Sequence, residues 1–416
     1  MRRCGAARSP PACEAMTRPR LVEFGTLSFA YFAALGLFAP YASLWFSALG
    51  FSTMAIGIIS ALQSCSRLLA PYAWSWAGDH SGRRVELIRL ATVGCVLASL
   101  GLLGVEGAVA VACMTGLLYL ANSGVVPLYE TVLAHLLQTD EGMDRARYGR
   151  VRMWGSVGFI LSVGLFGAWF QWGGIQTFPW TVAGINAFLL WAAFRLSPTR
   201  ASATHDEPPP PVLGRLRKPE VQWFFLSIFF TVLAHSVMGG FFSLYLEKLG
   251  YGPAAIGVLW ALAVAAEIVF FATQGRWLRF GSPHDWLIFV AAITAIRFAV
   301  TAGLGTWTLA LVLAQLTHSV TFAGHHASCI VLISRYFPDR ARGRGQALYA
   351  MLGYGVPGVL GGLGGGWLIS HLGFEAAFWA SAASGALALL CAWRARQTDA
   401  ARAHPADGPS PPLLSP

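Results

Sequence analysis

The stretch YASLWFSALGFSTMAIGIISAL, residues 41–62, decides how this chain folds, because a related stretch occurs 200 residues later. Residues 241–262 read FFSLYLEKLGYGPAAIGVLWAL, and nine of the 22 aligned positions are identical. The identical pairs are Ser43/Ser243, Leu44/Leu244, Leu49/Leu249, Gly50/Gly250, Ala55/Ala255, Ile56/Ile256, Gly57/Gly257, Ala61/Ala261 and Leu62/Leu262. Such self-similarity at a fixed shift indicates a chain built from two related halves.

Composition places both halves in a membrane. Of the 416 residues, 56% are hydrophobic and 12% are charged, whereas a soluble domain carries about 25% charged residues. A helix needs about 20 mostly apolar residues to cross the hydrocarbon core, and long continuous runs favour helices over a barrel. The sequence predicts an all-α protein with twelve spans, at 21–47, 54–77, 85–104, 107–137, 150–171, 177–196, 220–246, 254–275, 285–303, 306–335, 344–370 and 373–394.

The net charge of +10 reports orientation rather than a nucleic-acid partner. Of the 29 Lys and Arg residues, 26 lie in the tails or in alternate gaps between spans, while the other gaps hold only Lys248. By the positive-inside rule, both termini and the central linker are expected in the cytoplasm of a bacterium, with the spans in its inner membrane. Both halves then start on the same side, so the repeat is parallel, as in transporters that rock two bundles about a central cavity.

The expected organisation has five parts. A cytoplasmic tail (1–20) precedes a six-helix bundle (21–196), a Pro-rich linker (197–219), a second six-helix bundle (220–394) and a disordered tail (395–416). The first apolar run is too long for a cleavable signal, and Met16 is an alternative start. The seven cysteines show no CxxC spacing and are interpreted as small apolar fillers or free thiols.

Ionisable residues within the spans are the candidate functional groups, because a charge at the centre of a span costs about 2.5–3.5 kcal/mol. Each must therefore be paired or face water. These residues are Arg67, Glu130, His235, Glu267, Arg297, His318, His325 and His326.

Their spacing suggests how they act together. The 200-residue shift sets Arg67 against Glu267, and both are expected to face the cavity. His318 and His325 are seven residues apart and share one helix face. The expected pairs are Arg297 with Glu267, beside a histidine of the tenth span, and Arg67 with Glu130.

Two interpretations of these residues stay open. The acid–base pairs can be structural salt bridges, and His235 and His326 are slightly better explained as packing residues. A functional role is favoured for His318 and His325. Histidine titrates near neutral pH, and a carboxylate that exchanges an Arg partner for a proton can tie protonation to conformation. A free cavity arginine would bind an anionic substrate.

A short loop after the second span reads GDHSGRR and contains Asp79, Gly82, Arg83 and Arg84. A basic cytoplasmic turn explains the arginines but not the Asp and Gly. The loop resembles the signature loop of the major facilitator superfamily, although Ser75 replaces its usual glycine. The resemblance implies that the acid caps a neighbouring helix and that the arginines bind acidic partners across an inner gate.

Four further stretches resemble the phenylpropionate permease family of that superfamily, a relative of lactose-permease-type symporters. They are YFAALGLFAPYASLWFSALGFS, VVPLYETVLAHLLQ with YGRVRMWGSVGFI, GVLWALAVAAEIVFF, and LTHSVTFAGHHAS. The resemblance implies a major facilitator fold over about 21–394 and a coupling set of Glu267, Arg297 and His318. Glu130 stands where the family has Asp, and Thr321 and Phe322 stand where lactose-permease-type proteins carry a further acid.

The sequence and the resemblance together predict a monomeric proton symporter of a small aromatic carboxylate such as 3-phenylpropionate, without cofactor or metal. A symporter of a sugar or nucleoside, or an exporter of a drug or metabolite, is the alternative. A membrane enzyme is disfavoured, because no acid follows the His325–His326 pair at a catalytic spacing and no nucleotide loop is present. A sensor is disfavoured because the linker and tails provide no signalling segment.

Overall fold

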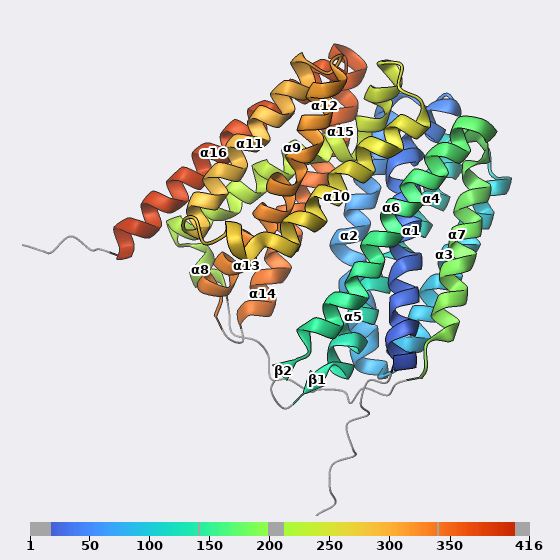
Figure 1. The fold of residues 1–416 in the computed structure, drawn as a ribbon, viewed down its shortest axis with the longest axis horizontal. Coiled ribbons are helices and arrows are strands. Elements are labelled where there is room, and N and C mark those ends of the chain that lie inside the picture. Colours follow the sequence, from blue (N-terminus) through green and yellow to red (C-terminus); the bar gives the residue numbers. More distant parts are fainter. Residues whose placement is uncertain (1–17, 140–141, 199–211, 339–340, 404–416) are drawn as a thin grey trace, which may run out of the picture.

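The computed structural model describes residues 18–139, 142–198, 212–338 and 341–403. They form two bundles of helices that stand side by side (Figure 1). The first bundle comprises α1 (Arg18–Ala48), α2 (Thr53–Ser81), α3 (Arg84–Gly104), α4 (Ala108–Asn122), α5 (Val125–Leu136), α6 (Arg145–Gly173), the 3₁₀ turn η1 (Ile175–Thr177) and α7 (Phe178–Arg195).

The second bundle follows a short helix, α8 (Leu213–Leu216). It contains two π-helical segments, which are named η2 and η4. The elements are α9 (Pro219–Lys248), α10 (Pro253–Trp277), α11 (Pro283–Gly303), α12 (Thr308–Leu316), η2 (Ser319–Gly324), α13 (His325–Tyr336), α14 (Arg342–Leu348), η4 (Tyr349–Gly355), α15 (Val356–Leu372) and α16 (Phe374–Ala403).

Eleven helices of the described chain are long and apolar enough to cross a membrane. One of them, Ala108–Leu136, combines α4 and α5. The twelfth predicted span, 306–335, is present as α12, η2 and α13, none of which is long enough by itself. The predicted all-α fold is therefore confirmed, and the π segment beside His318 interrupts the regular hydrogen bonding of the tenth span.

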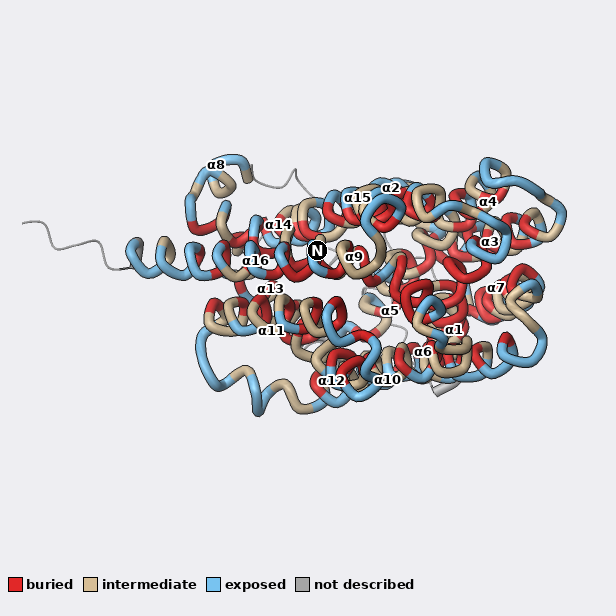
Figure 2. The backbone as a smooth tube through the Cα atoms, turned by 90° about the horizontal axis from the view of Figure 1, so that it is seen from above, coloured by how far each residue is buried: buried red, intermediate tan, exposed pale blue. Residues whose placement is uncertain are grey.

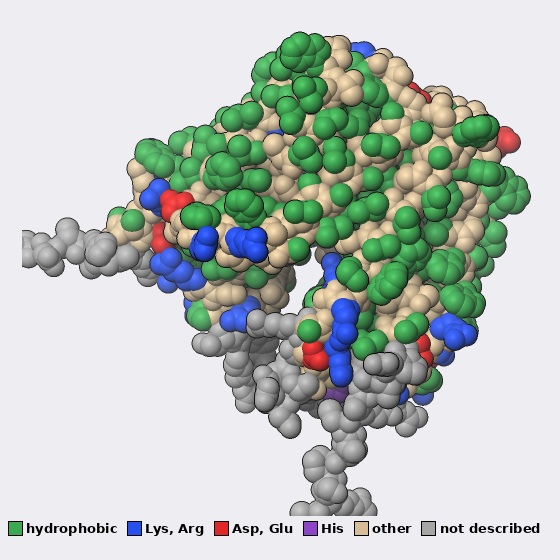
Figure 3. Space-filling model, in the orientation of Figure 1, with side chains coloured by type: hydrophobic (Ala, Val, Ile, Leu, Met, Phe, Trp, Pro, Cys, Tyr) green, Lys and Arg blue, Asp and Glu red, His purple; other side chains and the backbone are tan. Residues whose placement is uncertain are grey.

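The outer surface of the bundles is apolar. Large side chains such as Leu69, Leu97, Leu165 and Trp180 are more than half exposed, and hydrophobic side chains are spread over the face of both bundles in Figure 3. Such a surface needs lipid as its solvent. The chain is a multi-pass membrane protein.

The repeated sequence forms the same turn twice. Gly50 joins α1 to α2 with φ +81°, and Gly250 joins α9 to α10 with φ +89°. In both turns, the residue after the glycine donates its backbone N–H to a carbonyl five residues back, at 3.0 Å. Only glycine adopts this left-handed backbone without strain, which explains why both copies keep it.

A second shared glycine lies where the bundles meet. A Cβ at Gly57 on α2 would collide with the backbone of Gly362 on α15, and a Cβ at Gly257 on α10 would lie 2.8 Å from the carbonyl oxygen of Val163 on α6. Each repeat therefore supplies one glycine that lets its helix touch a helix of the other bundle. In Figure 2, α15 lies beside α2 and α10 lies beside α6.

The buried core shows which end of the molecule is closed. One apolar cluster contains residues of both bundles, among them Tyr41 and Tyr245. A second cluster contains only residues between 24 and 196, and a third only residues between 221 and 395. The bundles thus share a core at one end and have separate cores at the other. Figure 3 shows a hollow between them at the end where Lys and Arg gather.

Two local features differ from expectation. The helix α16 continues to Ala403, so the expectation of a disordered tail from 395 is wrong for residues 395–403, while 404–416 lie outside the description. Asp399 on the extra turns contacts Arg335 at 3.1 Å and His284 at 3.4 Å, which ties the helix end to the bundle. The described chain also contains one two-residue hairpin, β1 (Gln138–Thr139) with β2 (Gly142–Met143), between α5 and α6.

Candidate functional site

A cavity of about 630 Å³ lies between the two bundles. The first bundle lines it mainly through α1, α2 and α4, and the second through α9, α10, η2 and η4. Of the predicted site residues, Arg67, His318 and His325 line this cavity; Glu130, Glu267 and Arg297 do not. A separate apolar groove lies between α2, α3 and α4 on the outer surface, where lipid would cover it.

The wall from α2 is a polar stripe that ends in Arg67. Ser60, Gln63, Ser64 and Arg67 line the cavity at spacings of three and four residues, which places them on one helix face. The Arg67 side chain is exposed, and it makes no hydrogen bond or ion pair with any residue that the structure describes. Its guanidinium is thus available to a bound molecule.

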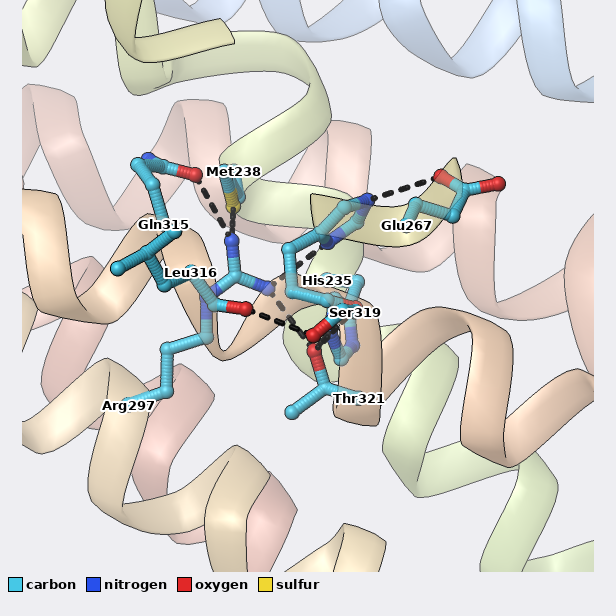
Figure 4. A network of polar contacts seen from close by, with 9 residues as sticks. His235, Met238, Glu267, Arg297, Gln315, Leu316, Ser319 and Thr321 are labelled. Atoms are coloured by element: carbon cyan, nitrogen blue, oxygen red, sulfur yellow. Dashed lines mark hydrogen bonds and ion pairs between the residues drawn. The ribbon is translucent and has the colours of Figure 1, made fainter. Parts of the chain in front are cut away.

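The opposite wall contains a buried arginine with neutral partners. Arg297 on α11 is 2% exposed. One guanidinium nitrogen donates to Thr321 Oγ1 and to His318 Nδ1, both at 3.1 Å. The other lies 3.1 Å from Gln315 Oε1 and from Met238 Sδ. Figure 4 shows Met238, Gln315 and Thr321 around the guanidinium.

The same geometry fixes the tautomer of His318. Because arginine only donates hydrogen bonds, Nδ1 of His318 must accept, and the neutral ring carries its hydrogen on Nε2. That nitrogen lies 3.8 Å from Oε2 of Glu267. The predicted direct pair of Arg297 and Glu267 is therefore wrong: His318 stands between the two charges and is too far from Glu267 for a strong hydrogen bond.

Glu130 has a different partner from the one predicted. Its carboxylate accepts from Arg152 on α6 at 3.1 Å, and Arg152 also donates to Tyr129 at 3.3 Å. The guanidinium of Arg152 lies 5.0 Å from the ring centre of Phe32. The predicted pair of Arg67 and Glu130 is therefore wrong, because α6 rather than α2 brings the cation to α5.

Arg152 was not among the predicted site residues, because it was counted with the basic residues of a cytoplasmic gap. Its position inside the predicted span 150–171 could have identified it as a candidate site residue. Arg152 also lies within electrostatic reach of Glu267 and His326 on the second bundle. Arg152 thus pairs with a carboxylate of the first bundle and acts at longer range on one of the second.

The other histidines of the tenth span have local partners. His325 lines the cavity, and its Nε2 lies 3.4 Å from the sulfur of Cys329 one turn later. His326 points elsewhere and contacts the hydroxyl of Tyr349 at 3.3 Å. No three His, Cys, Asp or Glu side chains gather at a possible metal site in the described ranges.

Within the predicted gating loop, an acid and an arginine of the loop bind each other. Asp79 accepts from Arg84 at 2.6 Å, so it meets the start of α3 through a side chain and does not cap the helix backbone as expected. Gly82 ends α2 with φ +65°. Arg83 is exposed at the hollowed end of the molecule. A role of these residues across a gate stays a prediction.

Comparisons with known proteins agree with this architecture. A model of the MFS_1 like family matches residues 21–380. The "Probable 3-phenylpropionic acid transporter" of Escherichia coli (strain K12) is 27% identical over 85% of this chain and 92% of its own length. The "Maltose permease" of Geobacillus stearothermophilus is 26% identical over 85% of this chain and 88% of its own length.

Solved structures share the fold. The nucleoside transporter NupG superposes with a TM-score of 0.77 at 16% identity and covers 92% of this chain and 99% of its own. A POT family transporter in complex with a thioalcohol conjugated peptide superposes with a TM-score of 0.69 at 12% identity, over 92% of this chain and 95% of its own. Both arrangements match the two-bundle architecture described above.

Proposed function

Because the chain belongs to the MFS_1 like family of transporters and is not an enzyme, we propose that it is a proton symporter of a small aromatic carboxylate. The substrate would resemble 3-phenylpropionate and cross by alternating access. The observation that carries the proposal is Arg67, an exposed cavity arginine without a partner among the described residues. A guanidinium binds a carboxylate through two parallel hydrogen bonds.

The other two arginines near the cavity, Arg297 and Arg152, already have hydrogen-bond partners. Arg297 is surrounded by acceptors, and Arg152 holds Glu130. Phe38, Phe46, Phe159, Trp260 and Phe322 line the same cavity and can enclose an aromatic ring. The similarity to a probable 3-phenylpropionic acid transporter supports the same substrate class.

For the coupling proton, Glu267 is a better candidate than Glu130. Glu130 accepts a charged hydrogen bond from Arg152, which favours its ionised form. Among the described residues, Glu267 forms no ion pair with an arginine: its contact is the neutral ring of His318 at 3.8 Å, Arg152 acts on it only at longer range, and its side chain is 21% exposed. A carboxylate so weakly compensated can take up a proton, and His318 then transmits the loss of charge to Arg297.

We further propose the orientation of the transport cycle. The cavity opens toward the end where Lys and Arg gather. The positive-inside rule assigns that end to the cytoplasmic side of the bacterial inner membrane. The structure would then correspond to an inward-open monomer with both termini in the cytoplasm. Closure of that end would bring the basic loop with Asp79, Gly82, Arg83 and Arg84 toward the second bundle.

The test is uptake of radiolabelled 3-phenylpropionate into proteoliposomes with an imposed pH gradient. Wild-type protein should accumulate it, and Arg67→Gln should reduce uptake to about a tenth or less, since a charged hydrogen bond contributes about 1.5–3 kcal/mol. The control is Arg279→Gln, an exposed arginine outside the cavity. Unchanged uptake by Arg67→Gln would contradict anion binding at this residue.

A sugar is the second candidate, and two observations favour it. The maltose permease is a relative of similar identity, and the α2 stripe of Ser60, Gln63 and Ser64 offers hydroxyl and amide groups beside Trp260. The same vesicles should therefore be tested with maltose and with a nucleoside. Proton-driven accumulation of a neutral solute that survives Arg67→Gln would favour this candidate over the carboxylate.

A further inference from the structure

His235 on α9 connects the cavity to the buried Arg297 cluster. It lines the cavity, and its Nδ1 lies 2.7 Å from the carbonyl oxygen of Thr231. A carbonyl only accepts, so Nδ1 carries a hydrogen. In the neutral ring Nε2 must then accept, and it lies 3.1 Å from Oγ1 of Thr321.

The hydroxyl of Thr321 is therefore shared between two groups. It accepts from Arg297 at 3.1 Å, and its single hydrogen is free to point at Nε2 of His235. Figure 4 shows Thr321 between His235 and the guanidinium. The contacts form a continuous series, His235–Thr321–Arg297–His318, which ends 3.8 Å from Glu267.

A protonated His235 would change this pattern. Its Nε2–H would donate to Thr321, so the Thr321 hydrogen would turn to its other acceptor, the carbonyl oxygen of His318 at 3.5 Å. Thr321 could still accept from Arg297. The added proton thus leaves the guanidinium in place but adds a positive charge on the cavity side of Thr321.

In the described part of the chain, no carboxylate in direct contact with His235 compensates that charge. The ionisable groups within electrostatic reach of His235 are Arg297 on α11, His318 beside η2 and His325 on α13. No ion pair joins His235 to a carboxylate among the residues the structure describes, and on the α2 side the cavity presents the cation Arg67. The open side of His235 faces the cavity, so a bound anion is the available counter-charge.

We propose that His235 binds a proton together with the anionic substrate, and that Thr321 transmits this protonation to the Arg297–His318–Glu267 series. The proposal rests on the proposed function, because it needs an anion in the cavity. It gives His235 a role separate from that of Glu267: His235 neutralises the substrate's charge while the cavity is occupied. Binding of a carboxylate should then be tighter at low pH.

The first test measures binding of 3-phenylpropionate to purified protein by calorimetry at pH 5.5 and pH 7.5, in a Glu267→Gln background that removes titration of Glu267. The dissociation constant should fall about tenfold at the lower pH. Adding His235→Gln, whose amide can still contact Thr321, should reduce this ratio to about twofold or less. Adding His326→Gln instead should leave the ratio unchanged, since His326 contacts Tyr349 outside the series.

A second test does not need the substrate. Histidine-selective ¹⁵N NMR of the solubilised protein, assigned with His235→Gln, should show His235 as the Nδ1–H tautomer at pH 7.5. Thr321→Val should shift its Nε2 signal, while Thr321→Ser should keep it.

The outcomes separate the two ideas. A pH ratio that persists in His235→Gln, or an Nε2–H tautomer, would overturn the proposal for His235. Failure of wild-type protein to bind or transport any aromatic carboxylate would overturn the proposed function, and the NMR result would still decide whether His235 and Thr321 form the described connection.

Discussion

Three arginines near the cavity differ in what surrounds each guanidinium. Arg67 is exposed without a described partner, Arg152 pairs with a carboxylate, and Arg297 is buried among neutral acceptors. Residue type identified two of them as candidates. Their partners did not follow from sequence, because a helix face does not say which neighbouring helix will pack against it.

Arg297 should be intolerant of even a conservative change. Arg297→Lys keeps the charge but cannot reach Thr321, His318 and Gln315 at once, which leaves buried acceptors unpaired. We expect a loss of about 2–3 kcal/mol, seen as a lower thermal unfolding temperature in detergent. Arg279→Lys, at an exposed position, is the control. Equal unfolding temperatures of the two variants would contradict the role of Arg297 in binding several acceptors at once.

Arg152 and Glu130 should behave as a coupled pair. The two side chains are 39% and 35% exposed, so their interaction energy is discounted by solvent to about 1 kcal/mol. A double-mutant cycle with Arg152→Gln and Glu130→Gln, read by thermal unfolding, should give that coupling. The same cycle between Arg67 and Glu130 should give none, and a coupling there would restore the pair first predicted from the sequence.

Glu267→Gln should separate transport from its driving force. Without a titratable carboxylate at Glu267, accumulation under a pH gradient should be reduced, because only the proton proposed for His235 stays coupled to the substrate, while exchange of labelled for unlabelled substrate should continue. The measurement compares the two assays in the same vesicles. Normal accumulation by Glu267→Gln, with loss in Glu130→Gln, would assign the proton to Glu130 instead.

At the scale of helices, the repeat explains two pairs of glycines, and the tenth span contains a break that the sequence did not predict. The shared turn and the inter-bundle contact both follow from the identities at Gly50/Gly250 and Gly57/Gly257. The split of 308–336 into α12, η2 and α13 could not be foreseen, because a π segment depends on the packing around His318 and Thr321 and leaves the apolar pattern intact.

A bulky side chain at the glycine contacts should favour opening of the end that is closed here. Gly57→Leu would separate α2 from α15, and Gly257→Leu would separate α10 from α6. Spin labels on the turns after α1 and α9 should report a longer distance in both variants, with reduced uptake. Gly184→Leu is the control, because nothing lies within 4 Å of a Cβ there. An unchanged distance would contradict closure by these glycines.

The end of α16 should add modest stability. Asp399→Asn removes the ion pair with Arg335, whose side chain is 55% exposed, so the loss should be about 1 kcal/mol. Thermal unfolding of the purified protein measures it. Because the tail was expected to be disordered from residue 395, an unchanged unfolding temperature would mean that these contacts add nothing to the fold.

At the scale of the whole molecule, the two bundles and their parallel relation followed from the 200-residue shift and the basic gaps. The open and closed ends did not. Both copies of the repeat carry the same turn and the same glycine contact. The sequence therefore does not distinguish a structure that is open at one end from one that is open at the other. Only the packing of side chains shows that the bundles share a core at one end and part at the other.

The separate cores also bear on how the protein assembles during synthesis. The first bundle completes an apolar cluster from residues 24–196, before the ribosome has made any of its partner. The third cluster, in the second bundle, likewise draws on residues 221–395 alone. Each half can therefore reach a stable intermediate by short-range contacts, and only the shared cluster must wait for both. Two polypeptides divided between the bundles and produced in one cell should consequently reassemble into a working transporter.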